Sequence, residues 1–519
     1  MRLNSFTHSN IHSFTHCTRK YPHFFGLNKV KFLTSTTFFI TLWFELIFTA
    51  VLTFFRLNTL FHILSLLLLV VIIKLPFLGD KLPVLLPELE WMLVGEKIHG
   101  GSFLYKEIWT NVGPLSAFIY WAIDLSFGRS QFIYEFIAIL VVYFQALYFT
   151  FVCNTRQTYL EKNFAPGLIY ILLMSLSFDM SKLSPVLLST TFLLFAFNKL
   201  IKQMERREGV SDEVFEVGLY IGIASLFHQP SMIFIVWSIA SLVFFTNANI
   251  RQHFLAILGF GLPLFLSGLY FYFYDSLDEF KYNWFNGIFR IKQYSLEDFK
   301  SALTAVTVPS ALAIVGFLRQ TQVSRYNSYQ QRTQQIMLIW GIASVLALFL
   351  SPNVAPMQFI ILVPFFTFFI TGFFFHIKGA FLPELLFTIL FIFIIFVQYQ
   401  GVTPFVGKGF EQLADMRVKP REMPDLMKGQ KMLVIGERID EYKYGQSATC
   451  YLNWDLSKID LENPDNYESI INIFDNFKKD PPTIIVDKQN VIPKIFLRIP
   501  ALAADYKATT EKGIYQRKF

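Results

Sequence analysis

The sequence predicts a polytopic all-α membrane protein with about 11–12 transmembrane helices and a small C-terminal external α/β domain. Three observations support this prediction. Of the 519 residues, 54% are hydrophobic and only 16% are charged, whereas a soluble domain carries roughly 25% charged residues. Apolar runs of about 15–24 residues recur, which is the length that a helix needs to cross a bilayer. After residue 400 the composition becomes that of a soluble domain.

The expected membrane helices follow one another from the first third of the chain to residue 397. They lie near residues 58–78, 131–153, 166–180, 184–200, 214–228, 231–247, 253–274, 304–318, 334–350, 354–375 and 380–397, with an additional run at about 32–54. Basic residues fall in every second loop, which marks those loops as cytoplasmic. They are Arg156, Lys162, Lys199, Lys202, Arg206, Arg207, Arg251, Arg319, Arg325, Arg332 and Lys378.

This alternation requires that the apolar stretch Val112 to Phe127 does not cross the bilayer. Gly113-Pro114 interrupts it and Asp124 adds a charge, so we expect a helix that lies in the external surface or dips into it. The loop 79–130 and the tail from about 400 to 519 then share the external side.

The domain boundaries follow from the same pattern. Residues 55–398 form the transmembrane domain and residues 399–519 the external α/β domain. Residues 1–54 have two interpretations, because the run 32–54 would place Arg19 and Lys20 outside: an extra span of unusual orientation, or an upstream extension of the chain.

The tail carries local signals of an α/β domain. We expect buried strands at 431–435 and 483–486, helices at 467–479 and 492–506, and a last strand at 513–517. Gly436 stands alone, without the G-x-G-x-x-G spacing of a dinucleotide site.

Several function classes find no support in the sequence. It lacks H-E-x-x-H, Walker A, paired C-x-x-C and G-x-S-x-G motifs. The net charge of +7 reflects the cytoplasmic loops of a membrane protein rather than a nucleic-acid partner. Cys17, Cys153 and Cys450 have no metal-like spacing.

Candidate catalytic residues stand just beyond an external membrane boundary. Glu88 and Glu90 precede Trp91 there, and burial near apolar surfaces raises the proton affinity of a carboxylate. Either could act as a general base toward an acceptor, or help to hold a divalent cation against a phosphate leaving group. The alternative is that both are solvated charges on an amphipathic surface helix. Glu96-Lys97 is expected to be an ordinary exposed pair.

Candidate substrate-binding residues occupy the other external segments: Tyr105, Lys106, Glu107, Asp179, Lys182, His228, Gln229, Arg290 and Lys292. Tyr105, with Trp109 and Trp121, could stack on sugar rings, or belong to the aromatic belt of the interface. Asp179, Lys182, His228 and Gln229 stand at external helix ends, where the cations could pair with a lipid diphosphate or simply cap and snorkel. Arg290 and Lys292, in the 275–303 loop, offer another anion-binding surface or a solvated amphipathic helix.

The order of these features resembles the GT-C superfamily of glycosyltransferases that use lipid-phosphate sugars, in particular the bacterial relatives of protein mannosyltransferases and of the lipid A aminoarabinose transferase. The resemblance covers roughly residues 55–519. It rests on Glu88-Leu89-Glu90, on Gly100 to Glu107 with Tyr105, Lys106 and Glu107, on Gly113-Pro114-Leu115 and Phe127 to Ser130, on Phe227 to Pro230, on Pro356 to Pro364, and on the tail segments 481–487 and 514–515.

The sequence also departs from the family pattern. The leading Asp of the acidic pair is absent, His228 replaces a Lys, Gly113 replaces a Pro, and Met357-Gln358 replaces a His-Tyr. By analogy Glu88 would be the counterpart of the catalytic acidic residue, with Glu90 its neighbour. The loss of the Asp would fit a different acceptor or an inactive transferase.

The resemblance implies an integral membrane glycosyltransferase of the bacterial inner (cytoplasmic) membrane. It would move a sugar, with inversion, from a polyprenyl-phosphate carrier to a glycan, lipid or protein acceptor on the external, periplasmic side. No cofactor is certain; a divalent cation stays open, with no ligand set to name. Two alternatives remain: a catalytically inactive GT-C-like scaffold in envelope assembly, and a transporter, which the absence of repeated halves disfavours.

Overall fold

The computed structural model describes residues 51–77, 82–205, 211–246, 248–285, 287, 296–322, 325–351, 355–379, 381–402, 413, 415–419 and 428–518. The chain divides into two compact units, Met1–Val51 and Leu52–Phe519, and the elements below belong to the second. Of the predicted run 32–54, only residues 51–54 fall among the described residues, in α3 (Val51–Phe55). Arg290 and Lys292 also lie outside the described residues.

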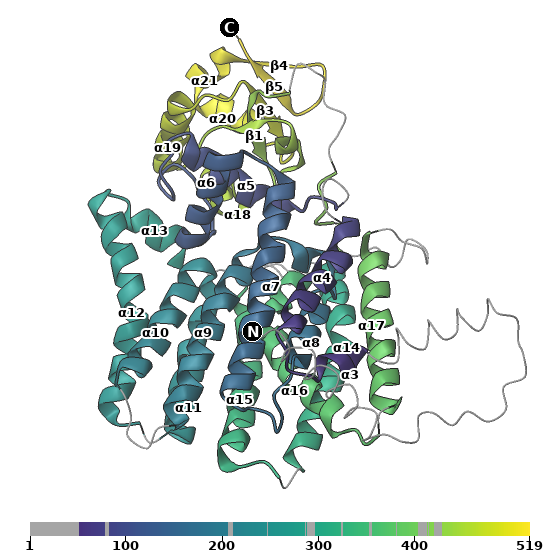
Figure 1. Cartoon of the computed structure of the whole chain (residues 1–519). Coiled ribbons are helices and arrows are strands. Elements are labelled where there is room, and N and C mark those ends of the chain that lie inside the picture. Colours follow the sequence, from purple (N-terminus) through teal and green to yellow (C-terminus); the bar gives the residue numbers. More distant parts are fainter. Residues whose placement is uncertain are drawn as a thin grey trace, which may run out of the picture. The chain divides into compact units, whose positions relative to one another are not determined.

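Each predicted apolar run from 58 to 397 contains a helix, so the prediction of an all-α membrane part is confirmed. Figure 1 shows these helices side by side. They are α4 (Phe61–Lys74), α7 (Gln131–Thr155), α8 (Ala165–Leu173), α9 (Pro185–Glu205), α10 (Ser211–Phe227), α11 (Phe234–Phe245), α12 (Ile250–Phe273), α14 (Leu296–Thr321), α15 (Ser328–Leu350), α16 (Val363–His376) and α17 (Phe381–Val402).

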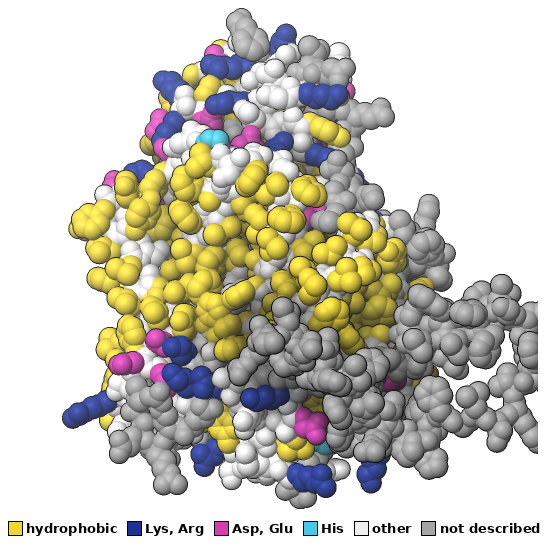
Figure 2. All heavy atoms as spheres, in the orientation of Figure 1, with side chains coloured by type: hydrophobic (Ala, Val, Ile, Leu, Met, Phe, Trp, Pro, Cys, Tyr) yellow, Lys and Arg dark blue, Asp and Glu magenta, His cyan; other side chains and the backbone are white. Residues whose placement is uncertain are grey.

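Within the described residues, six helices are long and apolar enough to cross a membrane by themselves. They correspond to α7, α9, α12, α15, the continuous η5–α16 segment (η5, Pro356–Leu362) and α17. Figure 2 shows a broad band of apolar side chains over the helical part, with Lys and Arg gathered beyond it. Soluble proteins rarely expose so large a continuous area of Phe, Leu and Ile side chains. The band is therefore the lipid-facing surface of a multi-pass membrane protein.

The backbones of α10 and α12 approach each other closely. A Cβ atom on Gly218 of α10 would overlap the carbonyl oxygen of Ala256, and one on Gly259 of α12 would overlap that of Phe215. Small residues let helix backbones approach in a membrane, where packing rather than the hydrophobic effect drives helix association. The two glycines therefore set the spacing of this pair.

Between α4 and α7 the chain forms two shorter helices, α5 (Leu86–His99) and α6 (Pro114–Phe127). The 14 residues of α6 span about 21 Å, less than the roughly 30 Å of a bilayer core. This length supports our expectation that α6 does not cross the membrane. One face of α6 buries Ala117, Tyr120 and Asp124, while Phe118 and Leu125 are exposed.

The tail folds as a five-stranded sheet with helices beside it (Figure 1). The strand order is β2-β1-β3-β5-β4, with β1 parallel to β2 and β3, and β5 antiparallel to β3 and β4. The elements are β1 (Lys431–Ile435), β2 (Gln446–Ser447), β3 (Ile484–Asp487), β4 (Tyr506–Ala508), β5 (Ile514–Arg517), α18 (Trp454–Leu461), α19 (Tyr467–Lys479), α20 (Ile492–Arg498) and α21 (Pro500–Asp505).

The predicted α/β character of the tail is confirmed. The three expected strands are β1, β3 and β5, and the expected helix at 467–479 is α19. The expected helix at 492–506 is broken into α20 and α21, because Ile499 adopts a non-helical conformation before Pro500. Ile485, Ile473 and Phe477 pack together in the core of this domain.

Candidate active site at the start of the acidic helix

The site begins where α5 begins. Leu85 is extended, and the helix starts with Pro87 in its first turn, where a missing N–H costs nothing. Glu88 occupies the third helical position, and its Oε2 accepts a hydrogen bond from the Leu85 backbone N–H at 3.3 Å. The helix dipole favours a carboxylate at this end. Local sequence therefore fixes both the start of α5 and the direction of Glu88.

Glu88 is one member of a buried ion cluster, which we call the ion triad: Glu88, Lys182 and Glu135. The Lys182 ammonium lies 3.0 Å from Glu88 Oε2 and 2.9 Å from Glu135 Oε1. The three side chains are only 0–2% exposed. They come from α5, from the link before α9, and from the first turns of α7. The structure thus brings a predicted catalytic residue and a predicted binding residue into direct contact.

The electrostatics of the ion triad favour a carboxylate that can take up a proton. Burial raises the pKa of Glu88, although the Lys182 ammonium beside it acts in the opposite direction. Two carboxylates and one ammonium leave the ion triad with an excess of negative charge. Glu88 Oε1 is buried and accepts no hydrogen bond from the described residues. The arrangement therefore combines a raised proton affinity with a carboxylate oxygen that accepts no hydrogen bond from the described residues.

The ion triad does not fit a divalent cation. Glu88 and Glu135 already share Lys182 as their counter-ion, and an ammonium in that place would repel a metal. Among the described residues, no group of three or more His, Cys, Asp or Glu side chains gathers in a way that could hold a metal ion.

A second buried polar cluster adjoins the ion triad along the chain. Lys74, at the end of α4, donates to Ser181 Oγ at 2.6 Å and to the Met174 carbonyl oxygen at 3.0 Å. Asp179, in η2 (Phe178–Ser181), accepts a hydrogen bond from the Met357 N–H at 2.7 Å. The segment from Asp179 to Lys182 therefore contacts four helical elements, namely α4, α5, α7 and η5.

Glu90 has a different environment from Glu88. It is half-buried, and its Oε1 accepts hydrogen bonds from Thr110 Oγ1 at 2.9 Å and from Asn453 Nδ2 at 3.2 Å. Burial raises its pKa, while these two hydrogen bonds lower it. Glu90 thus faces the C-terminal domain rather than Lys182.

The predicted substrate-binding residues Tyr105, Lys106 and Glu107 are engaged in contacts within the protein. The Tyr105 ring is fully buried, and its hydroxyl donates to the Val112 carbonyl oxygen at 2.6 Å. Lys106 lies 2.9 Å from the Asp275 carbonyl oxygen. Glu107 accepts a hydrogen bond from the Phe103 N–H at 2.7 Å and forms an ion pair with Lys479.

The end of α10 places the remaining predicted binding residues. His228 is 8% exposed. Gln229 donates to the Phe285 carbonyl oxygen at 2.8 Å and also to that of Trp284. A Cβ atom on Gly113 would overlap the Leu226 carbonyl oxygen, so the Gly113-Pro114 turn contacts this helix end directly. Gln229 therefore contacts residues 284 and 285 rather than the ion triad.

Three residues of the site were not found from the sequence. Glu135 lies inside a predicted span, and the high cost of an ionisable group in a membrane helix could have drawn attention to it. Lys74 could have been found by the same argument. Asn453 carries no such signal, because its partner Glu90 is 363 residues away in the chain.

Comparisons with known proteins return membrane glycosyltransferases. No family model and no curated protein matches the sequence. Among solved structures, the chain is similar to ArnT from Cupriavidus metallidurans bound to undecaprenyl phosphate, with 9% identity and a TM-score of 0.48 over 68% of this chain and 67% of that one.

The chain is also similar to two structures of the oligosaccharyltransferase from Archaeoglobus fulgidus. For AglB in complex with an inhibitory peptide and a dolichol-phosphate, the identity is 11% and the TM-score 0.46, over 88% of this chain and 74% of that one. For the apo form the values are 12% and 0.48, over 82% and 69%. ArnT and AglB are GT-C membrane glycosyltransferases, the superfamily that the motifs of this sequence resemble.

Proposed function

We propose that this chain is an integral membrane glycosyltransferase of the bacterial inner membrane. It takes a sugar from a polyprenyl-phosphate carrier and moves it to an acceptor on the external, periplasmic side, where residues 79–130 and the C-terminal domain lie. The observation that carries the proposal is the buried Glu88 carboxylate. It stands in the acidic motif that resembles the GT-C pattern, pairs with Lys182, and keeps one oxygen free of hydrogen bonds from the described residues.

The ion triad supplies the two functions that such a transfer needs. The acceptor attacks the anomeric carbon, the bond from that carbon to the phosphate oxygen breaks, and the phosphate leaves with the electron pair. Glu88 Oε1 takes the acceptor proton as a general base. Once Glu88 is neutral, Lys182 loses one of its two counter-ions, and its charge becomes available to stabilise the departing phosphate.

Glu88 is 1% exposed and Lys182 is fully buried, so the proposed site would be closed in this conformation. An acceptor reaches Glu88 Oε1 only after α5 or the segment Asp179 to Lys182 has shifted. Lids that close over a site and exclude water are common in enzymes. The same sealed geometry gives the second candidate function its support: in a catalytically inactive scaffold, the ion triad would serve only to hold α5 on the transmembrane helices.

Transfer assays on matched variants separate the two functions. Membranes with wild type, Glu88→Gln or Glu135→Gln at equal protein levels would receive polyprenyl-linked sugars from the host. Both substitutions remove one carboxylate from Lys182, but only Glu88 is placed as the base. We expect Glu88→Gln to lower transfer by about 10²–10⁴-fold, the usual contribution of a general base, and Glu135→Gln to lower it much less.

Other outcomes would redirect the assignment. Equal transfer by all three proteins would move the chemistry away from Glu88. If wild type transfers nothing while both substitutions lower the melting temperature alike, the scaffold is the better description.

A further inference from the structure

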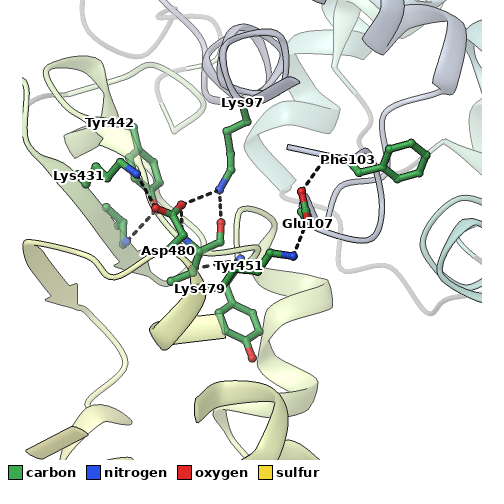
Figure 3. A network of polar contacts seen from close by, with 10 residues as sticks. Lys97, Phe103, Glu107, Lys431, Tyr442, Tyr451, Lys479 and Asp480 are labelled. Carbon is green, nitrogen blue, oxygen red and sulfur yellow. Dashed lines mark hydrogen bonds and ion pairs between the residues drawn. The ribbon is translucent and has the colours of Figure 1, made fainter. Parts of the chain in front are cut away.

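The acidic helix α5 is held by the C-terminal domain at both of its ends. Near its end, the Lys97 ammonium donates to the Thr449 carbonyl oxygen and lies 3.8 Å from Asp480 Oδ2 (Figure 3). The expectation that Lys97 belongs to an ordinary exposed pair is therefore wrong, because Lys97 is only 8% exposed. Glu96 pairs instead with Arg129, whose guanidinium also donates to the Gly445 carbonyl oxygen at 3.2 Å.

Asp480 organises this far end of the contact. One of its oxygens accepts a hydrogen bond from Lys431 at 2.7 Å and the other from the Thr449 N–H at 3.0 Å (Figure 3). Thr449 has φ of 60°, a left-handed conformation that is costly for a β-branched residue. Two hydrogen bonds hold Thr449 in this conformation, one from Lys97 to its carbonyl oxygen and one from its N–H to Asp480. The far end of α5 is thus fixed to a rigid turn.

The loop that follows Thr449 reaches toward the start of α5. The Trp109 N–H donates to the Cys450 carbonyl oxygen at 2.8 Å, and the Asn453 N–H donates to the Trp109 carbonyl oxygen at 3.1 Å. The Trp109 ring packs on the core of the C-terminal domain, edge-on to Tyr451 at 5.2 Å. Trp109 therefore serves as an anchor within the protein, and the external loop is bound to the sheet domain by both backbone and side chain.

Asn453 completes the contact at the start of α5. Its Nδ2 donates to Glu90 Oε1 at 3.2 Å, while its Oδ1 caps α18 by accepting from the Asp455 N–H at 3.1 Å. Glu90 follows Glu88 by two residues. Since α5 is a single helix, the hydrogen bond to Glu90 restrains the whole first turn on which Glu88 stands.

We propose that Asn453 is a positioning residue, which acts through Glu90 to fix the start of α5 and so hold Glu88 against Lys182; the inference rests on the proposed glycosyltransferase function. Glu90 then belongs to the support of the site rather than to the proton transfer. A general base must stay within hydrogen-bond reach of the acceptor, and a displacement of about 1 Å can cost about 10²-fold in rate. The C-terminal domain thus contributes to catalysis without touching the substrate.

The two functions of the Asn453 amide allow a sharp test. Asn453→Asp keeps the oxygen that caps α18, since Asp is as good a cap as Asn, but it removes the donor and sets a second carboxylate against Glu90. Asn453→Ser keeps a cap, removes the donor and adds no charge. In the double variant Asn453→Asp/Glu90→Gln, the new amide at position 90 can donate to the new carboxylate at position 453, so the hydrogen bond is restored with its direction reversed.

Two readouts are needed on the full chain in lipid nanodiscs. The first is transfer, measured as kcat and KM for the polyprenyl-linked donor. The second is amide hydrogen exchange of residues 85–90 and 109–110, which reports how readily the first turn of α5 opens and needs no activity. We expect Asn453→Asp to raise hydrogen exchange in both segments and to lower kcat about 10–100-fold, with little change in KM. Asn453→Ser should show smaller changes in the same direction. The double variant should recover both the exchange rates and kcat.

The outcomes separate this inference from the proposed function. Normal exchange and normal kcat in Asn453→Asp would overturn it, and so would raised exchange with unchanged kcat, which would make the contact merely structural. A double variant that stays as defective as Asn453→Asp would also overturn it. If wild type shows no transfer, the proposed function fails, while exchange at 85–90 still decides whether Asn453 positions the first turn of α5.

Discussion

Removing the Lys182 ammonium should be the most damaging single change to the ion triad. In Lys182→Met, Glu88 and Glu135 would stay buried at 1–2% exposure without the ammonium that they share. Breaking a buried ion pair by removing one partner costs about 3–5 kcal/mol, and here two carboxylates lose the same partner. A shift of about 2 °C per kcal/mol, the lower end for larger domains, gives a fall of about 6–10 °C in the melting temperature.

The matched rescue tests the electrostatic cause of this loss. Adding Glu88→Gln and Glu135→Gln to Lys182→Met removes both buried carboxylate charges together with the ammonium, and replacing every member of a buried ion cluster costs less than removing one of them. We therefore expect the triple variant to recover most of the lost melting temperature. Thermal melting in nanodiscs at neutral pH measures all three proteins. A Lys182→Met protein that melts within about 1 °C of wild type, or a triple variant that melts no higher than Lys182→Met, would refute the reasoning.

Three further predictions concern the external loop and the tail. Gly113→Ala should lower the free energy of unfolding by about 1–3 kcal/mol, because its Cβ would overlap a backbone carbonyl of α10. Gly100→Ala should be tolerated, because its Cβ would lie 3.4 Å from the nearest atom, the Lys97 carbonyl oxygen; thermal melting compares the two variants. Partial burial acts to raise the pKa of Glu107, but the ion pair with Lys479 and the hydrogen bond from the Phe103 N–H lower it below its usual value. The ionised Glu107 therefore stabilises the fold at pH values above its usual pKa, and this stabilisation is lost as the pH falls through the lowered pKa. In Glu107→Gln the melting temperature should fall less steeply with decreasing pH than in the wild type, and the same pH dependence in both proteins would contradict this. Tyr467→Cys, at a side chain 84% exposed, should react with an impermeant thiol reagent from the external side, and Lys162→Cys only after the membrane is permeabilised; the reverse pattern would invert the topology.

The parts of the fold that sequence predicted well are those with a local cause. The helix α19 was expected within its observed bounds, because its apolar residues repeat at helical spacing. In the structure, Asn466 caps its start. The short strands β2 and β4 were not expected. They have two and three residues and owe their conformation to pairing with β1 and β5 rather than to their own pattern.

The sequence predicted some residues of the candidate site, but not the contacts between them. Glu88 and Lys182 were both candidates, yet nothing in their spacing indicated that they meet. Lys97 was expected to be exposed, because it stands next to Glu96 in the sequence and the two looked like an ordinary exposed pair. Its burial depends on Thr449, which lies 352 residues later. Contacts of this range are set by tertiary packing, which the periodicity of a single segment does not encode.

The contact between α5 and the C-terminal domain also has a consequence for biosynthesis. Lys97 emerges from the ribosome 352 residues before Thr449, which corresponds to roughly 20–70 s at about 5–20 residues per second. During that interval Lys97 and Glu90 still lack their partners in the tail. Glu88 can meet Lys182 much earlier. Assembly of the protein should therefore proceed in two stages, with the ion triad closing first and the sheet domain locking the acidic helix only when synthesis is nearly complete.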